Sequence, residues 1–265
     1  FNPLIIHFSS FDQIEENCEI NDDIKKLSDL FWPGPMTVIL KKKKKSKISE
    51  LASASLDTVG VRIPNNTTAL KLIKYFGKPI AAPSANTSSS LSPTEADHVF
   101  DYFKNDKNLS IILDGGSTKI GLESTIINIT NDEIHILRHG GVSAEELKEK
   151  FPQRIINIEQ KTNEKIISPG MLSKHYSPVV PLRINAEKAE KNELLIGFGP
   201  NYNAPNLSFE GNLVEAASNL FSFLARYQKK YSKIAIAPIP NKGIGRAIND
   251  RIKRATSKNQ AVGNS

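Results

Sequence analysis

The chain has 265 residues, of which 39% are hydrophobic and 24% are charged, and its formal net charge is +7 at pH 7. No segment approaches the roughly 20 apolar residues that a membrane helix needs, so we expect a globular protein without a membrane partner. Cys18 is the single cysteine, which excludes an intrachain disulfide and a cysteine-based structural zinc site and fits a reducing, cytoplasmic location.

The start of the chain has the pattern of an interior strand. Phe1-Asn2-Pro3-Leu4 contains no initiator methionine and runs directly into the apolar pair Ile5-Ile6. The basic head, apolar stretch and cleavage site of a signal peptide are absent there. We therefore expect an N-terminal truncation of a longer protein.

Strands and helices alternate along the first 150 residues. Apolar runs predict strands at 4–8, 36–40, 59–63, 79–83, 111–113, 124–129 and 134–137. Helical spacing predicts helices at 24–31, 68–76, 93–103 and 142–150, with a further helix start near Ser10 and Asp12. Capping boxes are expected at Ser92/Glu95 and Ser143/Glu146. This alternation predicts a mixed α/β domain.

A polar, linker-like stretch follows at 157–181 and ends in His175-Tyr176-Ser177-Pro178. Beyond it the pattern reads strand at 194–198, helix at 213–231, strand at 234–239 and helix at 243–254. The last part of the chain is therefore expected to form a small α/β unit of its own.

Ser84 and Asn86 are the first candidate site residues. They follow a short strand that ends at Pro83, and small neighbours such as Ala82 would let a ligand approach the backbone. Hydroxyl and amide groups at such a turn can donate hydrogen bonds to phosphate oxygens. The alternative is an ordinary turn stabilised by these side chains before a helix. The P-loop and dinucleotide-binding glycine motifs do not occur.

Three further residues stand at strand ends, and each has a plain alternative. Arg62 lies in an apolar run, where it would clamp a carboxylate or form a structural salt bridge. Arg138 precedes Gly140-Gly141, where the backbone would approach a phosphate or form an exposed turn. His7 is by itself more typical of a satisfied core histidine, and the lysine run 41–45 of a solvated loop or an RNA contact.

In their order along the chain, these segments resemble the YrdC-like threonylcarbamoyl-AMP synthases. The resemblance rests on Asn2 to His7, Trp32-Pro33-Gly34-Pro35-Met36-Thr37, Thr58 to Pro64, Ala82 to Asn86, Ser92-Pro93-Thr94, Gly121 to Ile126, Leu137-Arg138, Ser168 to Met171 and His175 to Pro178. It covers essentially the whole chain and includes the linker typical of the long, two-domain form of these enzymes.

The resemblance implies the domain organisation. It implies a twisted, mixed-sheet YrdC-like α/β domain with a deep concave cleft at residues 1–151. A linker at 152–181 is implied to cover that cleft. A small Rossmann-like α/β domain is implied at 182–265.

The resemblance also implies the roles of individual residues. The catalytic pair would be Ser84 and Asn86. Threonine would be bound by His7, Arg62, Ala82 and Ser124. ATP would be bound by Asn2, Thr58, Ser84, Ser92, Arg138 and Tyr176, with Tyr176 folding over the cleft from the linker. No resident metal site is implied, although Mg2+ is expected to accompany ATP.

The implied reaction joins L-threonine, bicarbonate and ATP to give threonylcarbamoyl-AMP and pyrophosphate, for threonylcarbamoyladenosine formation in tRNA. tRNA and a threonylcarbamoyl transferase are the further expected partners. The family carries a Lys-x-Arg pair upstream of the position matched by Asn2, and this pair is absent here. We therefore expect the 265-residue fragment alone to be weak or inactive, and the full protein to be active.

Two alternatives stay open at the level of sequence. The first is an RNA-binding module without catalysis, suggested by the basic balance and the lysine run 41–45. The second is the carbamoyl-adenylate-forming domain of a hydrogenase maturation enzyme, which shares the fold. The single cysteine argues against the second, because those proteins resemble fusions with zinc-binding modules.

Overall fold

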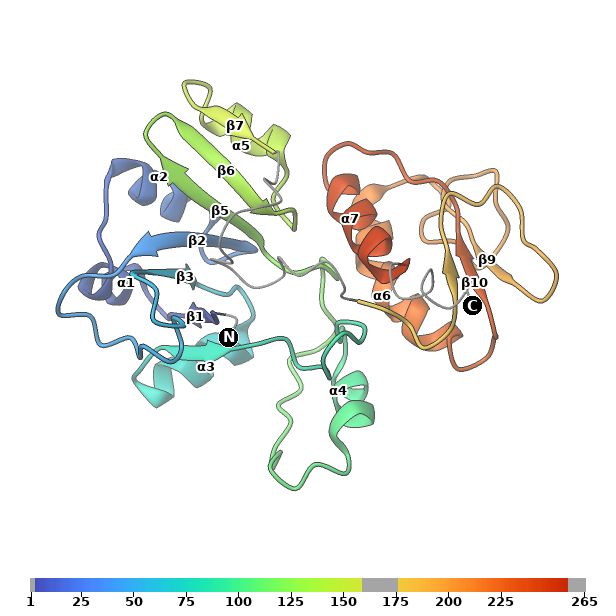
Figure 1. Ribbon diagram of the computed structural model, residues 1–265, viewed down its shortest axis with the longest axis horizontal. Coiled ribbons are helices and arrows are strands. Elements are labelled where there is room, and N and C mark those ends of the chain that lie inside the picture. Colours follow the sequence, from blue (N-terminus) through green and yellow to red (C-terminus); the bar gives the residue numbers. More distant parts are fainter. Residues whose placement is uncertain (1–2, 159–175, 257–265) are drawn as a thin grey trace, which may run out of the picture. The chain divides into compact units, whose positions relative to one another are not determined.

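A computed structural model describes residues 3–158 and 176–256 (Figure 1). The chain divides into two compact units, and each is built from two separate stretches of sequence. The first unit is Phe1–Pro83 with Glu123–Met171, and the second is Ser84–Leu122 with Leu172–Ser265. Each unit is described by itself below. Asn2 and the segment 159–175 lie outside the described residues.

The first unit contains a seven-stranded mixed sheet with the strand order β4-β1-β3-β2-β5-β6-β7. In Figure 1 the strands follow one another from β7 down through β6, β5, β2 and β3 to β1. The strands are β1 (Ile5–His7), β2 (Met36–Lys41), β3 (Thr58–Arg62), β4 (Ile80–Ala82), β5 (Thr125–Thr130), β6 (Glu133–Arg138) and β7 (Ile155–Asn157). The expected mixed α/β fold is therefore confirmed for this unit.

Residues along each strand alternate between the two faces of this sheet. Ile6 of β1, Val38 of β2 and Val61 of β3 are buried in the main hydrophobic cluster of the unit. Helices α1 (Phe11–Asn17), α2 (Asp22–Phe31) and α5 (Ala144–Lys150) add Ile14, Ile24, Leu27 and Leu147 to the same cluster. One face of the sheet is thus packed under helices.

The opposite face carries the other alternate residues. Ile5, Ile39 and Ile126 form a separate small apolar cluster there. His7, Arg62 and Arg138 lie on this face too, because the strand register places them in line with these three isoleucines.

The helix ends in this unit follow the expected chemistry. Helix α2 ends at Trp32, directly before the two prolines that flank Gly34. Helix α3 (Thr67–Phe76) ends at Gly77, which has φ 72° and donates its N–H to the carbonyls of Ile73 and Lys74. Ser143 and Glu146 form the predicted capping box at the start of α5.

The second unit contains a three-stranded parallel sheet with the order β8-β10-β9. Its strands are β8 (Leu182–Arg183), β9 (Leu194–Ile196) and β10 (Ile234–Ile236), and its helices are α4 (Ala96–Phe103), α6 (Leu213–Tyr227) and α7 (Gly245–Thr256). Helix α6 is the crossover that joins the parallel neighbours β9 and β10. Ile196, Ile236 and Leu220 are buried together in its core. The end of the chain thus contributes strands and helices in α/β order, in one unit with residues Ser84–Leu122.

Several expected elements are wrong or differ at their ends. The segment 111–113 is not a strand, and Ile111 and Leu113 are largely exposed. Helix α4 begins at Ala96, with Glu95 as its N-cap and without a side-chain cap, so the expected start at Pro93 and the Ser92/Glu95 capping box are not formed. The short strands β7 and β8 have no expected counterpart, because two or three residues are too few to show a period.

Among the described residues, no helix combines the length and the apolar character that a transmembrane span requires.

Candidate functional site

His7, Arg62 and Ala82 lie on the face of the sheet opposite to the main hydrophobic cluster, because the strand register fixes their orientation. His7 on β1 is paired with Arg62 on the parallel strand β3. Ala82 on β4 is paired with Ile5, two residues before His7. Paired residues of neighbouring strands place their side chains on the same face. Thr58, at the start of β3, is four residues from Arg62 and shares this face.

Ser124 and Arg138 approach this face from the hairpin of β5 and β6. Arg138 pairs with Ile126, which itself pairs with Thr37 on β2. The Nη2 of Arg138 donates to Ser124 Oγ at 3.0 Å, and its Nε donates to the carbonyl of Ser124 at 3.0 Å. Ser124 Oγ also lies 2.7 Å from Thr37 Oγ1. All three side chains are buried, so a rigid polar cluster backs this part of the sheet.

Arg62 carries a charge in a largely desolvated position. Burial, with a smaller effect of the nearby Arg138 guanidinium, lowers the pKa of Arg62 to about 10. Its Nε donates to the carbonyl of Gly34 at 2.9 Å. No carboxylate of the described residues forms an ion pair with it, so the salt bridge that was the structural alternative is not found there. Two neighbouring guanidinium groups favour an anionic ligand.

His7 is neutral in this environment. Burial, and then the charge of Arg62, lowers the pKa of His7 to about 4. Its Nδ1 is buried and lacks a hydrogen-bond partner among the described residues. Hydrogen bonding to the backbone of Ile80 and Ile5 opposes part of the lowering of its pKa, so the imidazole also has the backbone surroundings of a core histidine. The strand register places His7 on the same side of the sheet as Arg62.

Gly140, the first glycine of the pair after Arg138, packs against the backbone of its own chain, whereas the expectation was an approach to a phosphate. A Cβ atom at this position would lie 2.3 Å from the carbonyl oxygen of Glu123 and 2.4 Å from the nitrogen of Thr125. The glycine lets two backbone segments of the same chain touch, directly beside Ser124. Its role here is to fix the position of Ser124, and Arg138 is buried rather than exposed.

Ser84, Asn86 and Ser92 belong to the second unit, so they are placed relative to that unit only. Ser84 is exposed, Asn86 is half-buried and Ser92 is buried. Asn86 Nδ2 donates to the carbonyl of Ser90 at 2.9 Å. This hydrogen bond agrees with the alternative of an ordinary turn that is stabilised by its own side chains. Asn86 Oδ1 is buried and has no hydrogen-bond partner among the described residues, so this acceptor is unsatisfied there.

Tyr176 is buried in the core of the second unit with 2% exposure. Its ring centroid lies 5.7 Å from that of Phe221 on α6 and 5.0 Å from the guanidinium carbon of Arg251 on α7. It has φ 66°, a left-handed backbone conformation. Tyr176, which was predicted to contact the nucleotide, is thus packed among residues of the C-terminal part of the chain.

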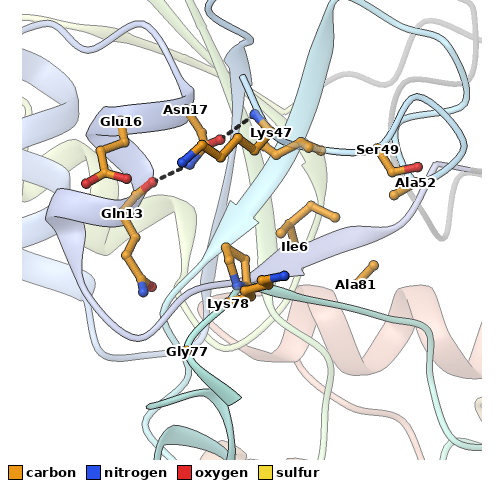
Figure 2. Close-up of a pocket in the computed structure, with 12 residues that line it drawn as sticks. Ile6, Gln13, Glu16, Asn17, Lys47, Ser49, Ala52, Gly77, Lys78 and Ala81 are labelled. Atoms are coloured by element: carbon orange, nitrogen blue, oxygen red, sulfur yellow. Dashed lines mark hydrogen bonds between the residues drawn. The ribbon is translucent and has the colours of Figure 1, made fainter. Parts of the chain in front are cut away.

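A pocket of about 490 Å³ lies in the first unit, away from the predicted residues (Figure 2). Ile6 lines it, so it opens on the side of β1 opposite to His7. Gln13 and Asn17 of α1 and Lys78 after α3 also line it. In Figure 2 the Asn17 side chain is held by Gln13 and Lys47, so its polar groups are already used. None of the predicted site residues contributes to this pocket.

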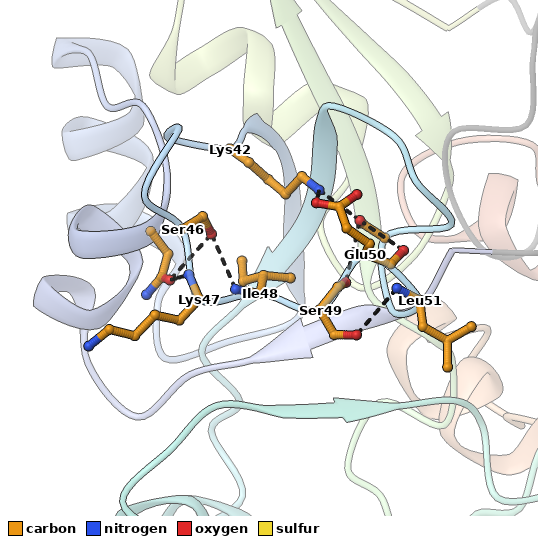
Figure 3. A network of polar contacts seen from close by, with 9 residues as sticks. Lys42, Ser46, Lys47, Ile48, Ser49, Glu50 and Leu51 are labelled. Atoms are coloured by element: carbon orange, nitrogen blue, oxygen red, sulfur yellow. Dashed lines mark hydrogen bonds and ion pairs between the residues drawn. The ribbon is translucent and has the colours of Figure 1, made fainter.

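The lysine run 41–45 is partly engaged in the structure of the first unit. Lys41 pairs with Glu19 at 3.0 Å, and Lys43 donates to the carbonyl of Glu15 at 2.5 Å. Lys42 pairs with Glu50 at 2.8 Å and donates to Ser53 Oγ at 2.9 Å, as Figure 3 shows for the Lys42–Glu50 pair. These contacts hold the loop between β2 and β3, which weakens the interpretation of the run as an RNA surface.

The described residues contain no group of three or more His, Cys, Asp or Glu side chains that could hold a metal ion. Sequence reasoning missed two residues of the site, Thr37 and Gly140, as positions that fix Ser124. The position of Thr37 between Met36 and Val38 could have pointed to it in the sequence. In a strand this spacing places the hydroxyl on the face opposite to both apolar neighbours.

Comparisons with known proteins cover nearly the whole chain. The family described as telomere recombination matches residues 1–140, and the family described as threonylcarbamoyl-AMP synthase, C-terminal domain, matches residues 142–257. The chain is 36% identical to a threonylcarbamoyl-AMP synthase of Pyrococcus abyssi, over 96% of this chain and 80% of the relative. It is 34% identical to that of Bacillus subtilis, over 96% of this chain and 79% of the relative.

Solved structures agree with these sequence matches. The crystal structure of P. abyssi Sua5 complexed with L-threonine has a TM-score of 0.84 and 34% identity, covering 96% of this chain and 80% of that chain. A variant of P. abyssi Sua5, in which an adjacent histidine and tyrosine are replaced by alanine, has a TM-score of 0.82 and 33% identity, covering 96% and 79%. The chain therefore belongs to the threonylcarbamoyl-AMP synthase family.

Proposed function

We propose that this protein synthesises L-threonylcarbamoyl-AMP from L-threonine, bicarbonate and ATP, with release of pyrophosphate, for the formation of threonylcarbamoyladenosine in tRNA. The observation that carries the proposal is the pairing of the desolvated Arg62 with a neutral His7 on one face of the sheet, next to Arg138 and Ser124. The L-threonine bound in the related P. abyssi structure supports it.

Threonine is bound by His7, Arg62, Ala82 and Ser124 in this proposal. Arg62 holds the carboxylate, because its guanidinium is largely desolvated and has no carboxylate partner among the described residues. The unsatisfied Nδ1 of His7 accepts or donates one hydrogen bond to the amino acid. Ala82 leaves space beside Ile5 for the small side chain.

ATP is bound by Asn2, Thr58, Ser84, Ser92, Arg138 and Tyr176. Arg138 stabilises phosphate charge from its fixed position on Ser124. Ser84 and Asn86 form the catalytic pair, and the exposed Ser84 hydroxyl and the unsatisfied Oδ1 of Asn86 support that assignment. Mg2+ accompanies ATP as part of the substrate, bound mainly by phosphates and water.

The reaction needs no covalent intermediate on the protein. The threonine amine captures bicarbonate as a carbamate with loss of water. A carbamate oxygen then attacks the α-phosphorus of ATP, the new P–O bond forms and the bond to the pyrophosphate oxygen breaks. The protein contributes positioning and stabilisation of charge, which makes it a nucleotidyltransferase in class.

The same proposal includes the domain organisation and the cellular context. A catalytic domain at 1–151 with a deep concave cleft, a linker at 152–181 and a small Rossmann-like domain at 182–265 fit the family matches at 1–140 and 142–257. The parallel order β8-β10-β9 with its helical crossover supports the Rossmann-like part. The protein acts in the cytoplasm, with tRNA and a threonylcarbamoyl transferase as downstream partners.

The test is the formation of threonylcarbamoyl-AMP and pyrophosphate by the full-length protein, followed by chromatography and mass spectrometry. Both products are expected only when threonine, bicarbonate and ATP are all present. Pyrophosphate release that does not depend on threonine or bicarbonate would contradict the scheme. RNA binding that weakens steeply with salt, without product formation, would favour the non-catalytic alternative.

A further inference from the structure

Arg251 on α7 is a buried charge that the reaction scheme leaves without a role. It is the largest fully buried side chain of the described residues, with 0% exposure. Burying a guanidinium group is unfavourable because the charge loses its hydration. Interactions inside the protein must therefore offset this desolvation. Asp250 accepts from its Nη1 at 2.6 Å, and the same carboxylate accepts from Arg254 Nε at 2.8 Å. Arg251 thus shares one carboxylate of α7 with a second guanidinium group.

The guanidinium of Arg251 also lies over the ring of Tyr176. The guanidinium carbon lies 5.0 Å from the ring centroid, within the range of a cation–π interaction. Phe221 on α6 packs against the same ring at 5.7 Å with a tilt of 34°. Tyr176 is thus held between a cation from α7 and an aromatic ring from α6. Its left-handed backbone, φ 66°, is a conformation that a tyrosine adopts only when its surroundings impose it.

Fixing Tyr176 also fixes the loop that carries the proposed catalytic pair. The N–H of Ser177 donates to the carbonyl of Ser89 at 2.9 Å. Leu91 is buried in the same apolar cluster as Tyr176. The next carbonyl in that loop, that of Ser90, accepts from Asn86 Nδ2 at 2.9 Å. A continuous set of contacts therefore leads from α7 to Asn86, all of it within the second unit.

We propose that Arg251 is a positioning residue: it holds Tyr176 in its packed conformation, and Tyr176 with Ser177 fixes the 84–91 loop in the geometry that the reaction needs. This rests on the proposed function, because the loop matters only if Ser84 and Asn86 act on the substrates. It also gives the C-terminal part of the chain a role in catalysis without any contact of its own with threonine.

The test compares Arg251→Met and Arg251→Lys with Lys253→Met, an exposed control on the same helix. Arg251→Met removes the cation but leaves Asp250 paired with Arg254. Hydrogen–deuterium exchange of peptides covering 84–91 and 176–184 is expected to become about 10-fold faster in Arg251→Met. Arg251→Lys keeps a cation over the ring and is expected to lie between this variant and the wild type.

The kinetic readout separates positioning from general loss of structure. In Arg251→Met, kcat is expected to fall by roughly 10- to 100-fold while the KM for threonine stays unchanged, since the threonine residues belong to the first unit. Lys253→Met is expected to behave like the wild type. Phe221→Leu removes the aromatic neighbour of the ring without touching a charge, and it is expected to give the same pattern.

Unchanged exchange in 84–91 when Arg251 is replaced would overturn the proposal. Equal acceleration in every peptide of the second unit would overturn it too, because that is general destabilisation. If Arg251→Met does not fold, Arg251→Lys and Phe221→Leu decide by the same outcomes. A wild-type protein that makes no threonylcarbamoyl-AMP refutes the proposed function, whereas the exchange data still report on Arg251.

Discussion

His7 and Arg62 are paired directly in the register of the parallel strands β1 and β3, and their side chains share one face of the sheet. Burial together with the guanidinium charge keeps the imidazole neutral, with a pKa of about 4. Burial and Arg138 lower the pKa of Arg62 to about 10, which leaves it charged at pH 7. The pair therefore offers one cation and one neutral hydrogen-bonding group, as a zwitterionic amino acid requires.

Replacement of Arg62 by methionine is expected to raise the KM for threonine by about 10- to 100-fold, because a charge-assisted hydrogen bond to a carboxylate contributes roughly 1.5–3 kcal/mol. Steady-state kinetics at saturating ATP and bicarbonate measure this. The exposed Lys74 on α3 gives a control, Lys74→Met, that is expected to leave the KM for threonine unchanged. An unchanged KM in Arg62→Met would remove Arg62 from the threonine site.

The stability of the protein is expected to depend on the protonation of His7. Its pKa is about 4 in the folded protein and 6.5 in the unfolded chain, so the unfolded state binds the proton first as the pH falls. The free energy of unfolding therefore keeps the full contribution of the neutral His7 above pH 6.5. This contribution is lost between pH 6.5 and about 4, by up to about 1.4 kcal/mol per pH unit. Chemical denaturation as a function of pH measures the slope.

The matched comparison is His7→Gln against His135→Gln. His135 bonds Thr130 Oγ1 at the surface of the β5–β6 hairpin. Removing His7 should flatten the slope below pH 6.5, and removing His135 should leave the contribution of His7 in place. An identical pH profile for His7→Gln and the wild type would mean that the imidazole is not desolvated in the folded protein.

Ser124 links two parts of the proposed site, so its replacement by alanine should affect both substrates. The hydroxyl contacts Thr37 Oγ1 and accepts from Arg138. Without it, Arg138 loses one of its two bonds to residue 124, and the KM values for threonine and ATP are both expected to rise.

A double-mutant cycle with Thr37→Val isolates the hydroxyl pair of Thr37 and Ser124. The free energies of unfolding of the single variants and the double variant are measured by chemical denaturation. A coupling of about 0.5–1.5 kcal/mol is expected for a buried hydrogen bond. Strict additivity would indicate that the two hydroxyls do not interact.

Lys42 is expected to stabilise the loop between β2 and β3. Its side chain is only 9% exposed and bonds Glu50 and Ser53 in the network of Figure 3. Lys42→Met should lower the free energy of unfolding by about 1–2 kcal/mol, measured by urea denaturation. The exposed Lys44 provides the control, and Lys44→Met should change it by less than about 0.5 kcal/mol. Equal effects of both substitutions would contradict a structural role specific to Lys42.

Local signals in the sequence were enough for most elements of the fold. The prolines after Trp32 end α2, Gly77 ends α3 and Ser143 with Glu146 starts α5, because these rules act within a few residues. They failed at 111–113, which has no sheet partner and leaves Ile111 and Leu113 exposed.

The sequence by itself determined the family, most of the helices and strands, and the residue types available for chemistry, since all of these depend on order and spacing along the chain. Only the tertiary structure decided that His7 and Arg62 are neighbours, that Gly140 is needed beside Ser124, and that Tyr176 packs against Arg251. The physical reason is that strand register and burial bring together residues that are not neighbours along the chain, and desolvation then sets which of them stays charged.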